Sequence, residues 1–275
     1  MKLTRRGAEL YYEARGSGPT LLLIPGGNGD AASFGALPQL LADQFTVVVP
    51  DRRGFSRSHL DGAPDDDRRL TDDVEDAVAL LGEFPSPAVV LGSSSGAIVG
   101  LHLLVRYPER VTTLIAHEPP LIALLPDAER WLAALDDVYS TYRASGAEAA
   151  MAQFGRVTGV EPPERPDTRT LPPHVVELMA RMQGNLDFFL EHELRQYVRL
   201  VPDLAALAAH TDRLVLASGR DSAEQLPYRP NLVLSERLGV PIAEFPGGHI
   251  GYLTHSAEFA VALSTVLQGH PTPAS

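Results

Sequence analysis

Six short runs of continuous apolar residues, separated by stretches with helical patterning, limit the folds open to this chain. The runs are TLLLIPG (20–26), FTVVVPD (45–51), AVVLGSS (88–94), VTTLIAHEP (111–119), RLVLASG (213–219) and PIAEFPG (241–247). Continuous rather than alternating apolarity is typical of strands that are covered on both faces. The sequence therefore predicts an α/β fold, with a mostly parallel, doubly covered central sheet.

Helices are expected between these strands, and a hairpin is expected before them. The helix candidates are residues 36–43, 72–83, 96–107 and 257–267. Thr71 precedes Asp72 and Asp73, and acidic groups favour the positive N-terminal end of a helix. The N-terminal KLTRRGAELYYEARG has a glycine turn between two polar–apolar runs, which predicts an antiparallel edge hairpin.

One long interval, from Pro119 to about Pro202, contains no strand candidate. A connection of that length is too long for a plain loop. Its helical stretches are 127–144, which Asp127 opens as N-cap, 147–157, 173–183 and 185–200, with proline-rich joints at 162–166 and 172–173. We expect a core domain of residues 1–120 and 203–275, and a helical cap of residues 121–202 over one end of the sheet.

Charge and composition exclude several classes of partner. The 275 residues carry a formal charge of −12, which disfavours nucleic acid and anionic membranes. A cluster of acidic residues is expected to form a solvated loop and an acidic first helical turn: Asp65, Asp66, Asp67, Asp72 and Asp73. The absence of cysteine excludes disulfides, thiolate metal sites and cysteine nucleophiles. Without a signal-like or membrane-spanning apolar stretch, we expect a soluble, cytoplasmic protein.

The segment VVLGSSSGAIVG (89–100) carries the strongest chemical signal. A strand that runs directly into a helix needs small residues two positions on either side of the apex, because the two backbones nearly touch there. Gly92 and Gly96 stand at both of these offsets from Ser94 alone. G-x-S-x-G between a strand and a helix predicts a nucleophile elbow, with Ser94 as the nucleophile. The alternatives are a flexible linker and a purely structural turn.

A serine nucleophile needs a base, and the base needs a carboxylate to orient it. His249, in FPGGHIGY, follows a short strand and a Gly-Gly turn, and we predict it as the general base. For the carboxylate we favour Asp221 in LVLASGRDS, which follows a late strand. Glu118, at the end of LIAHEPP one strand earlier, is the alternative acid.

Acyl transfer also needs donors for the oxyanion and a surface for the substrate. The predicted donors are the backbone N–H groups of Ser95 and Gly27, with Asn28 as an alternative to Gly27. Aromatic and methionine side chains in the interval 121–202 favour a lid over an apolar substrate, unless they form only the core of that segment. The candidate substrate contacts are Trp131, Tyr139, Phe154, Met179, Phe188 and Phe189.

The PGG loop, PDRRGFSRS (50–58), the elbow, GRD and GGH follow one another in an order that resembles the α/β-hydrolase fold family. The resemblance covers almost the whole chain. It implies a Ser–His–acid hydrolase with a helical cap and neither cofactor nor metal, and it makes the segment 51–58 a structural turn. A serine nucleophile excludes the dehalogenases and epoxide hydrolases of this fold, which use aspartate. We expect a small to medium apolar ester or lactone as the substrate.

Other interpretations remain open at this stage. The same triad serves acyltransferases, thioesterases and hydrolases of carbon–carbon bonds, and fold alone does not choose among them. A dinucleotide-binding protein is a rival, because Gly27-x-Gly29-x-x-Ala32 follows a strand and Asp51 closes the next one. A non-catalytic receptor for a small molecule is another, although all three members of a triad are present.

Overall fold

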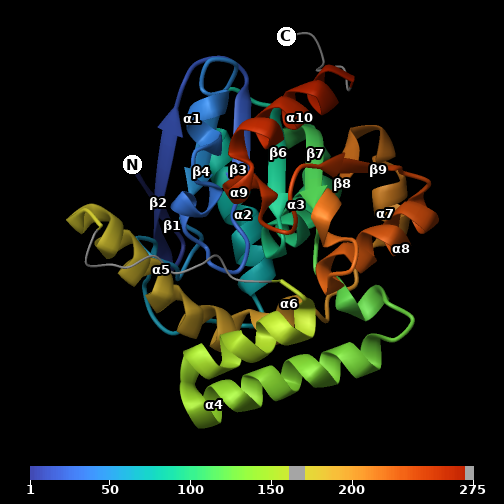
Figure 1. Cartoon of the computed structure of the whole chain (residues 1–275). Helices are drawn as coiled ribbons and strands as arrows, with labels where there is room; N and C mark the ends of the chain where they lie inside the picture. The colour runs from blue at the N-terminus through green and yellow to red at the C-terminus, as the bar shows by residue number, and fades with distance from the viewer. Residues whose placement is uncertain (161–170, 270–275) are drawn as a thin grey trace.

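The computed structural model describes residues 1–160 and 171–269. Within these ranges nine strands form one sheet in the order β1-β2-β4-β3-β6-β7-β8-β9, with β5 paired to β2 (Figure 1). The strands are β1 (Lys2–Arg5), β2 (Ala8–Arg15), β3 (Thr20–Ile24), β4 (Thr46–Pro50), β5 (His59–Leu60), β6 (Ala88–Ser93), β7 (Val111–His117), β8 (Leu214–Gly219) and β9 (Ile242–Phe245). All six apolar runs form strands, and these six pair in parallel, which confirms the predicted fold class.

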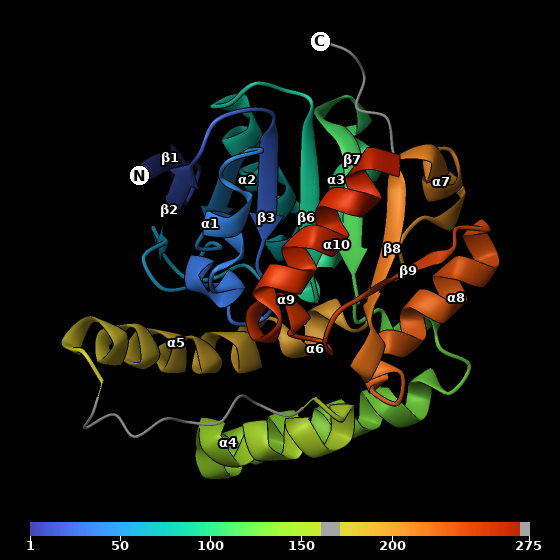
Figure 2. The same ribbon diagram turned by 45° about the horizontal axis from the view of Figure 1, so that its top comes forward.

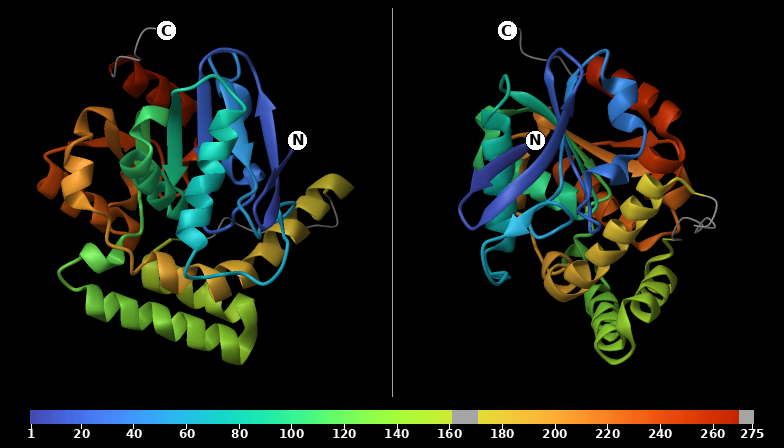
Figure 3. Two further views of the ribbon diagram at one scale, coloured as in Figure 1. Left: turned by 180° about the vertical axis from the view of Figure 1, so that it is seen from behind. Right: turned by 90° about the vertical axis from the view of Figure 1, so that its left-hand side faces the viewer.

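Helices cover both faces of the sheet, as Figure 3 shows from two further sides. The helices of the α/β part are α1 (Leu37–Leu41), α2 (Arg69–Gly82), α3 (Ser95–Arg106), α7 (Leu204–Ala208), α8 (Arg229–Leu238), α9 (Gly251–Thr254) and α10 (Ser256–Gly269). One core lies under α2, α3, α7 and α8, and a second lies under α1, α9 and α10. No helix in the described part of the chain is both long and apolar enough to cross a membrane.

The predicted hairpin is present at the edge of the sheet. Strands β1 and β2 pair antiparallel, with Lys2 opposite Tyr11 and Arg5 opposite Ala8. Gly7 lies in the turn with φ of 74°, a backbone conformation that glycine adopts at little cost. Strand β2 then pairs antiparallel with β4, so the hairpin joins the parallel part of the sheet.

A helical insertion lies across the carboxyl end of the parallel strands (Figure 2). It consists of α4 (Ala128–Thr158), α5 (Pro173–His192) and α6 (Leu194–Tyr197). These helices share a third apolar core, in which Leu135, Val138 and Leu190 are fully or almost fully buried. The proline-rich joint expected at 162–166 lies outside the described residues. The division into a core of 1–120 and 203–275 and a cap of 121–202 stays a prediction.

The acidic cluster divides between an exposed loop and helix α2. Asp65 and Asp67 are exposed, but Asp73 in α2 is only 5% exposed. Its carboxylate accepts hydrogen bonds from Arg52 Nη2 at 2.6 Å and from the Tyr197 hydroxyl at 2.5 Å. Burial alone would raise the pKa of Asp73, yet the neighbouring guanidinium groups hold it below its usual value. The expectation that Asp73 lies in an acidic first helical turn is therefore wrong, because α2 begins at Arg69 and the buried Asp73 lies beyond that turn.

Candidate active site

Ser94 occupies a strained turn between β6 and α3. Its φ and ψ are 55° and −126°, in a region that non-glycine residues rarely adopt. The turn is held at both ends, because Ser94 N donates to His117 O at 2.9 Å and Ala97 N donates to Ser94 O at 2.8 Å. Ser94 is the residue that was predicted at the apex of the elbow, and it stands immediately before the N-terminus of α3.

Two glycines make this turn sterically feasible. A Cβ atom on Gly92 would lie 2.3 Å from Gly96 O, and one on Gly96 would lie 2.2 Å from Ile24 O. Both obstacles are backbone atoms that cannot rotate away. The strand, the helix and the neighbouring strand therefore approach one another as closely as glycine allows.

Gly92→Ala is expected to destabilise the protein by about 2–3 kcal/mol, because the added methyl group must displace backbone. Gly82→Ala is the matched control, since a Cβ at that position in α2 meets nothing within 4 Å. Its expected effect stays within about 0.5 kcal/mol. Urea unfolding of both variants measures the difference. Equal midpoints for Gly92→Ala and the unmodified protein would contradict this account of the turn.

The three consecutive serines have different surroundings. Ser94 is partly exposed and lines a pocket, whereas Ser93 and Ser95 are buried. The Ser93 hydroxyl lies 3.4 Å from His117 Nδ1, and the Ser95 hydroxyl accepts from Arg52 Nη1 at 3.2 Å. Burial lowers the pKa of His117 to about 4, so this histidine is neutral at neutral pH. Of the three hydroxyl groups, that of Ser94 is the one with no competing structural contact among the described residues.

His249 is held by Glu118. It follows β9 after Gly247, whose φ is 77°, and its side chain is 11% exposed. His249 Nδ1 lies 2.6 Å from Glu118 Oε2. Glu118 itself follows β7 directly and is completely buried. Its φ of 47° is a second strained conformation beside the elbow.

The other oxygen of Glu118 is anchored by the segment after β8. Glu118 Oε1 accepts from Gly219 N at 2.8 Å and from the Ser222 hydroxyl. Burial alone would raise the pKa of Glu118, but the contact with His249, helped by the Ser222 hydroxyl, lowers it to about 2. The carboxylate is therefore ionised, and in a neutral imidazole it selects the tautomer with the proton on Nδ1 and the lone pair on Nε2.

The preference for Asp221 as the partner of His249 is wrong. Asp221 is exposed in the short 3₁₀ turn Arg220–Ser222, and its own backbone N–H donates to Gly247 O. The segment that carries it does reach the site, but through Gly219 and Ser222, which hold Glu118. Glu118, the alternative acid, is the residue whose carboxylate contacts the imidazole.

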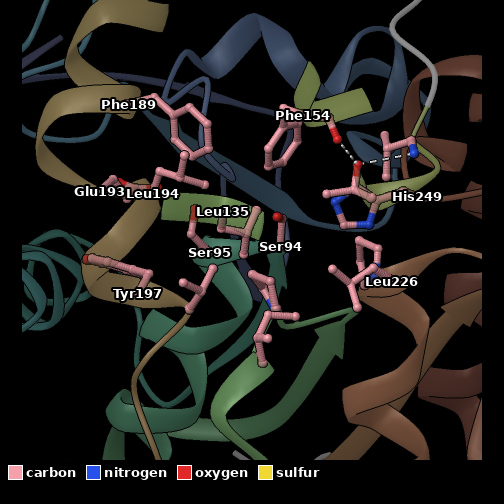
Figure 4. Close-up of a pocket in the computed structure, with 16 residues that line it drawn as sticks. Ser94, Ser95, Leu135, Phe154, Phe189, Glu193, Leu194, Tyr197, Leu226 and His249 are labelled. Carbon is pink, nitrogen blue, oxygen red and sulfur yellow. Dashed lines mark hydrogen bonds between the residues drawn. The ribbon is translucent and has the colours of Figure 1, made fainter. Parts of the chain in front are cut away.

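Ser94 and His249 line one pocket at the carboxyl end of the sheet. It contains about 500 Å³ of space, part of it open to solvent. Figure 4 shows both residues beneath the rings of Phe154 and Phe189. The lining is mainly apolar and includes Leu135, Phe154, Phe189, Leu194, Val198 and Leu226. The arrangement suits an apolar molecule with one polar bond placed at Ser94.

Two of the six predicted substrate contacts, Phe154 and Phe189, line this pocket, with ring centroids 5.8 Å apart. The other four, Trp131, Tyr139, Met179 and Phe188, do not line it, and their contact with substrate stays a prediction. Trp131 Nε1 donates to Asp127, the Tyr139 hydroxyl donates to Glu191, and Phe188 packs on Phe55. Leu135 and Leu226, which do line the pocket, looked like ordinary core residues in the sequence.

The glycine loop after β3 packs closely between Ser94 and the insertion. A Cβ on Gly26 would lie 2.9 Å from Ser94 Cβ, and one on Gly27 would lie 2.5 Å from the Phe189 ring. Asn28 is tied to α5, because its carbonyl oxygen accepts from Asn185 Nδ2 at 2.7 Å. The loop is therefore beside the nucleophile, and the roles of the Gly27 and Ser95 N–H groups as oxyanion donors stay predictions.

The interpretation as a dinucleotide-binding protein requires a carboxylate that is free to bind a ligand, and Asp51 is not free. Asp51 is completely buried, and it accepts from Ala31 N at 2.8 Å and from Arg57 Nε at 2.6 Å. This carboxylate holds the turn instead of facing a ligand. Among the side chains that the structure describes, no three His, Asp or Glu residues form a group that could hold a metal ion.

Comparison with known proteins agrees with this geometry. Residues 19–158 match the family model for the alpha/beta hydrolase fold. The chain is 35% identical over 269 residues to the uncharacterized hydrolase YraK of Bacillus subtilis, covering 95% of this chain and 93% of that protein. It is 27% identical over 285 residues to the zearalenone hydrolase of Bionectria ochroleuca, covering 97% of each.

Solved structures share the fold over almost the whole chain. A hydrolase from Pseudomonas aeruginosa superposes with a TM-score of 0.72 at 22% identity, covering 97% of both chains. The enol-lactonase from Burkholderia xenovorans superposes with a TM-score of 0.66 at 18% identity, covering 98% of this chain and all of that one. The protein belongs to the α/β-hydrolase fold family, and it is a hydrolase of that fold.

Proposed function

We propose that this protein is a serine hydrolase that cleaves an ester or lactone bond in a small, largely apolar substrate. One observation carries the proposal. The nucleophile elbow presents Ser94 to the same pocket as His249, and the far nitrogen of His249 is held by the ionised, buried Glu118. A nucleophile, a base and an orienting carboxylate are the parts that acyl transfer to serine requires.

In the proposed reaction His249 Nε2 takes the proton of Ser94 as Oγ attacks the substrate carbonyl. The N–H groups of Gly27 and Ser95 bind the resulting oxyanion. When the tetrahedral intermediate collapses, His249 donates the proton to the leaving oxygen and an acyl-enzyme remains on Ser94. Water then attacks the acyl-enzyme with His249 again as the base, and the carboxylic acid leaves.

The apolar lining of the pocket supports an apolar acyl or alcohol group, because burial of such a group against Phe154, Phe189 and Leu135 is favourable. The relatives named zearalenone hydrolase support hydrolysis of a small molecule.

Incubation with p-nitrophenyl butyrate tests the proposal. We expect saturable release of p-nitrophenolate and free butyrate, and a butyryl group on Ser94 after rapid acid quench. Binding without release would favour a receptor, and transfer of the acyl group to an added alcohol in preference to water would favour an acyltransferase.

Phe154→Ala is expected to shift the preference among acyl chains, because it removes a ring from the pocket wall. The ratio of kcat/KM for p-nitrophenyl hexanoate over p-nitrophenyl butyrate should rise about tenfold. Met151→Ala is the matched control: Met151 lies on the same helix and packs on the same apolar core, but it does not line the pocket. Equal ratios in the two variants would contradict the assignment of this pocket to the acyl group.

A further inference from the structure

A buried guanidinium group lies beside the proposed oxyanion hole. Arg52 lies two residues after the end of β4 and is 4% exposed. Its Nη1 lies within hydrogen-bond distance of three acceptors: Gly26 O at 3.2 Å, Ser95 Oγ at 3.2 Å and Glu193 Oε1 at 3.0 Å. Two N–H hydrogens are thus shared among three oxygens. One atom of Arg52 therefore contacts both segments that are proposed to supply the oxyanion donors.

The contact with Gly26 bears directly on Gly27. The carbonyl of Gly26 and the N–H of Gly27 belong to one planar trans peptide and point in opposite directions. Gly26 O also accepts from Gly29 N at 2.9 Å, which closes the four-residue turn. Any group that holds Gly26 O therefore fixes the direction of the Gly27 N–H. Hydrogen bonds to the carbonyl also polarise the peptide and make its N–H a better donor.

The contact with Ser95 acts on the second donor. Ser95 is the first residue of α3, and its N–H has no partner within that helix because it lies in the first turn. Ser95 is 3% exposed, and its hydroxyl accepts from Arg52. We propose that Arg52 is a positioning residue that holds the backbone N–H groups of Gly27 and Ser95 in the orientation that binds the oxyanion. This inference rests on the proposed serine chemistry.

Two buried carboxylates balance the charge of Arg52 and of a second buried arginine, so the cluster as a whole has no net charge. Arg52 and Arg69 are paired with Asp73 and Glu193, and the four side chains are each no more than 3% exposed. Glu193 comes from the junction between α5 and α6, so the insertion supplies half of the compensating negative charge. Arg52 does not itself line the pocket, whereas Ser95 and Glu193 do. Arg52 would thus act through the residues it touches.

Arg69 provides a matched control for Arg52. Both guanidinium groups are buried to the same extent, and both contact Glu193. Arg69 donates its remaining hydrogen bond to Arg53 O and is not bonded to Gly26 or Ser95. Replacing either by methionine removes one buried cation from the same cluster, but only Arg52→Met removes the hydrogen bonds to Gly26 O and Ser95 Oγ.

We expect Arg52→Met to lower kcat for p-nitrophenyl butyrate about 10- to 100-fold with KM within about twofold, because the loss falls on the transition state. The rate of phosphonylation of Ser94 by a fluorophosphonate should fall to a similar degree. Arg69→Met should keep kcat within about threefold. The melting temperature of each variant shows whether it is folded. If the single variants unfold, two double variants that keep the net charge of the cluster replace them. These neutral pairs are Arg52→Met with Asp73→Asn, and Arg69→Met with Asp73→Asn.

The inference is overturned if folded Arg52→Met keeps kcat and the phosphonylation rate within threefold, or if Arg69→Met loses as much as Arg52→Met. The same result from the neutral pairs overturns it too. The unmodified protein separates this failure from failure of the proposed function. If it reacts at Ser94 and hydrolyses the ester, an unaffected Arg52→Met variant removes only the role of Arg52. If it does neither, the serine chemistry and the role of Arg52 fail together.

Discussion

Ser94→Ala is expected to lower kcat for ester hydrolysis by about four to six orders of magnitude. The variant keeps the Cβ atom and the positive φ of the turn, so the melting temperature should change little. Substrate binding should also persist, because the apolar lining of the pocket is untouched. Steady-state kinetics on p-nitrophenyl butyrate, with the melting temperature measured in parallel, checks this result.

Ser93→Ala is the matched control for that experiment. Ser93 is the preceding residue of the same serine run, but it is buried beside His117 and does not line the pocket. Its replacement should keep kcat within about threefold. Comparable losses from Ser93→Ala and Ser94→Ala, in folded proteins, would contradict the assignment of the nucleophile.

Glu118→Gln is expected to lower kcat by about three to four orders of magnitude. Gly219 N and Ser222 Oγ both donate to Oε1, so the amide oxygen of glutamine takes that position. The amide NH₂ group then faces His249 Nδ1 and donates to it. The imidazole is driven into the tautomer with its proton on Nε2, which cannot accept the proton of Ser94.

Asp221→Asn tests whether Asp221, rather than Glu118, orients His249. Asp221 is exposed, and His249 Nδ1 contacts Glu118. Its replacement should keep kcat within about threefold. Measuring kcat for both variants under the same conditions decides between the two acids, and a larger loss from Asp221→Asn would contradict the assignment of Glu118.

Much of the fold could be predicted from local pattern, because the central strands are covered on both faces. Their continuous apolar runs need no knowledge of neighbours, and β6 at Ala88–Ser93 fills its predicted run of 88–94 to within one residue. Helix α8 at Arg229–Leu238 was not predicted. Pro230 in its first turn and Gly239 just beyond its end, with φ of 67°, were the available signals.

In the insertion, the two glycines at predicted helix breaks have different outcomes. The predicted break between 127–144 and 147–157 falls at Gly146, which has φ of 84° and ψ of 174° inside α4. The predicted break at Gly184 was wrong, because α5 continues through it to His192. The next residue, Asn185, bonds to the Asn28 carbonyl and to Ser56, and such contacts outweigh the roughly 1 kcal/mol cost of one helical glycine.

In the site, the residues that a sequence motif marks could be predicted, and those that depend on distances between side chains could not. Ser94 and His249 lie on short turns whose glycines mark them in the sequence. The choice between Glu118 and Asp221 depends on which side chain reaches His249, and both follow adjacent strands, β7 and β8, at the same edge of the sheet. The hydrogen bonds from Gly219 and Ser222 to Glu118 have no sequence signature. The role proposed for Arg52 has no sequence signature either, because Arg52 belongs to a turn to which the sequence analysis assigned no chemistry.

The most direct test of the central claim is to label the protein with a fluorophosphonate and map the adduct by mass spectrometry with fragmentation across Ser93, Ser94 and Ser95. The account predicts one adduct per chain, on Ser94, and slow labelling of the Glu118→Gln variant. An adduct on another residue, or no adduct on folded protein, would contradict the assignment of Ser94 as an activated nucleophile.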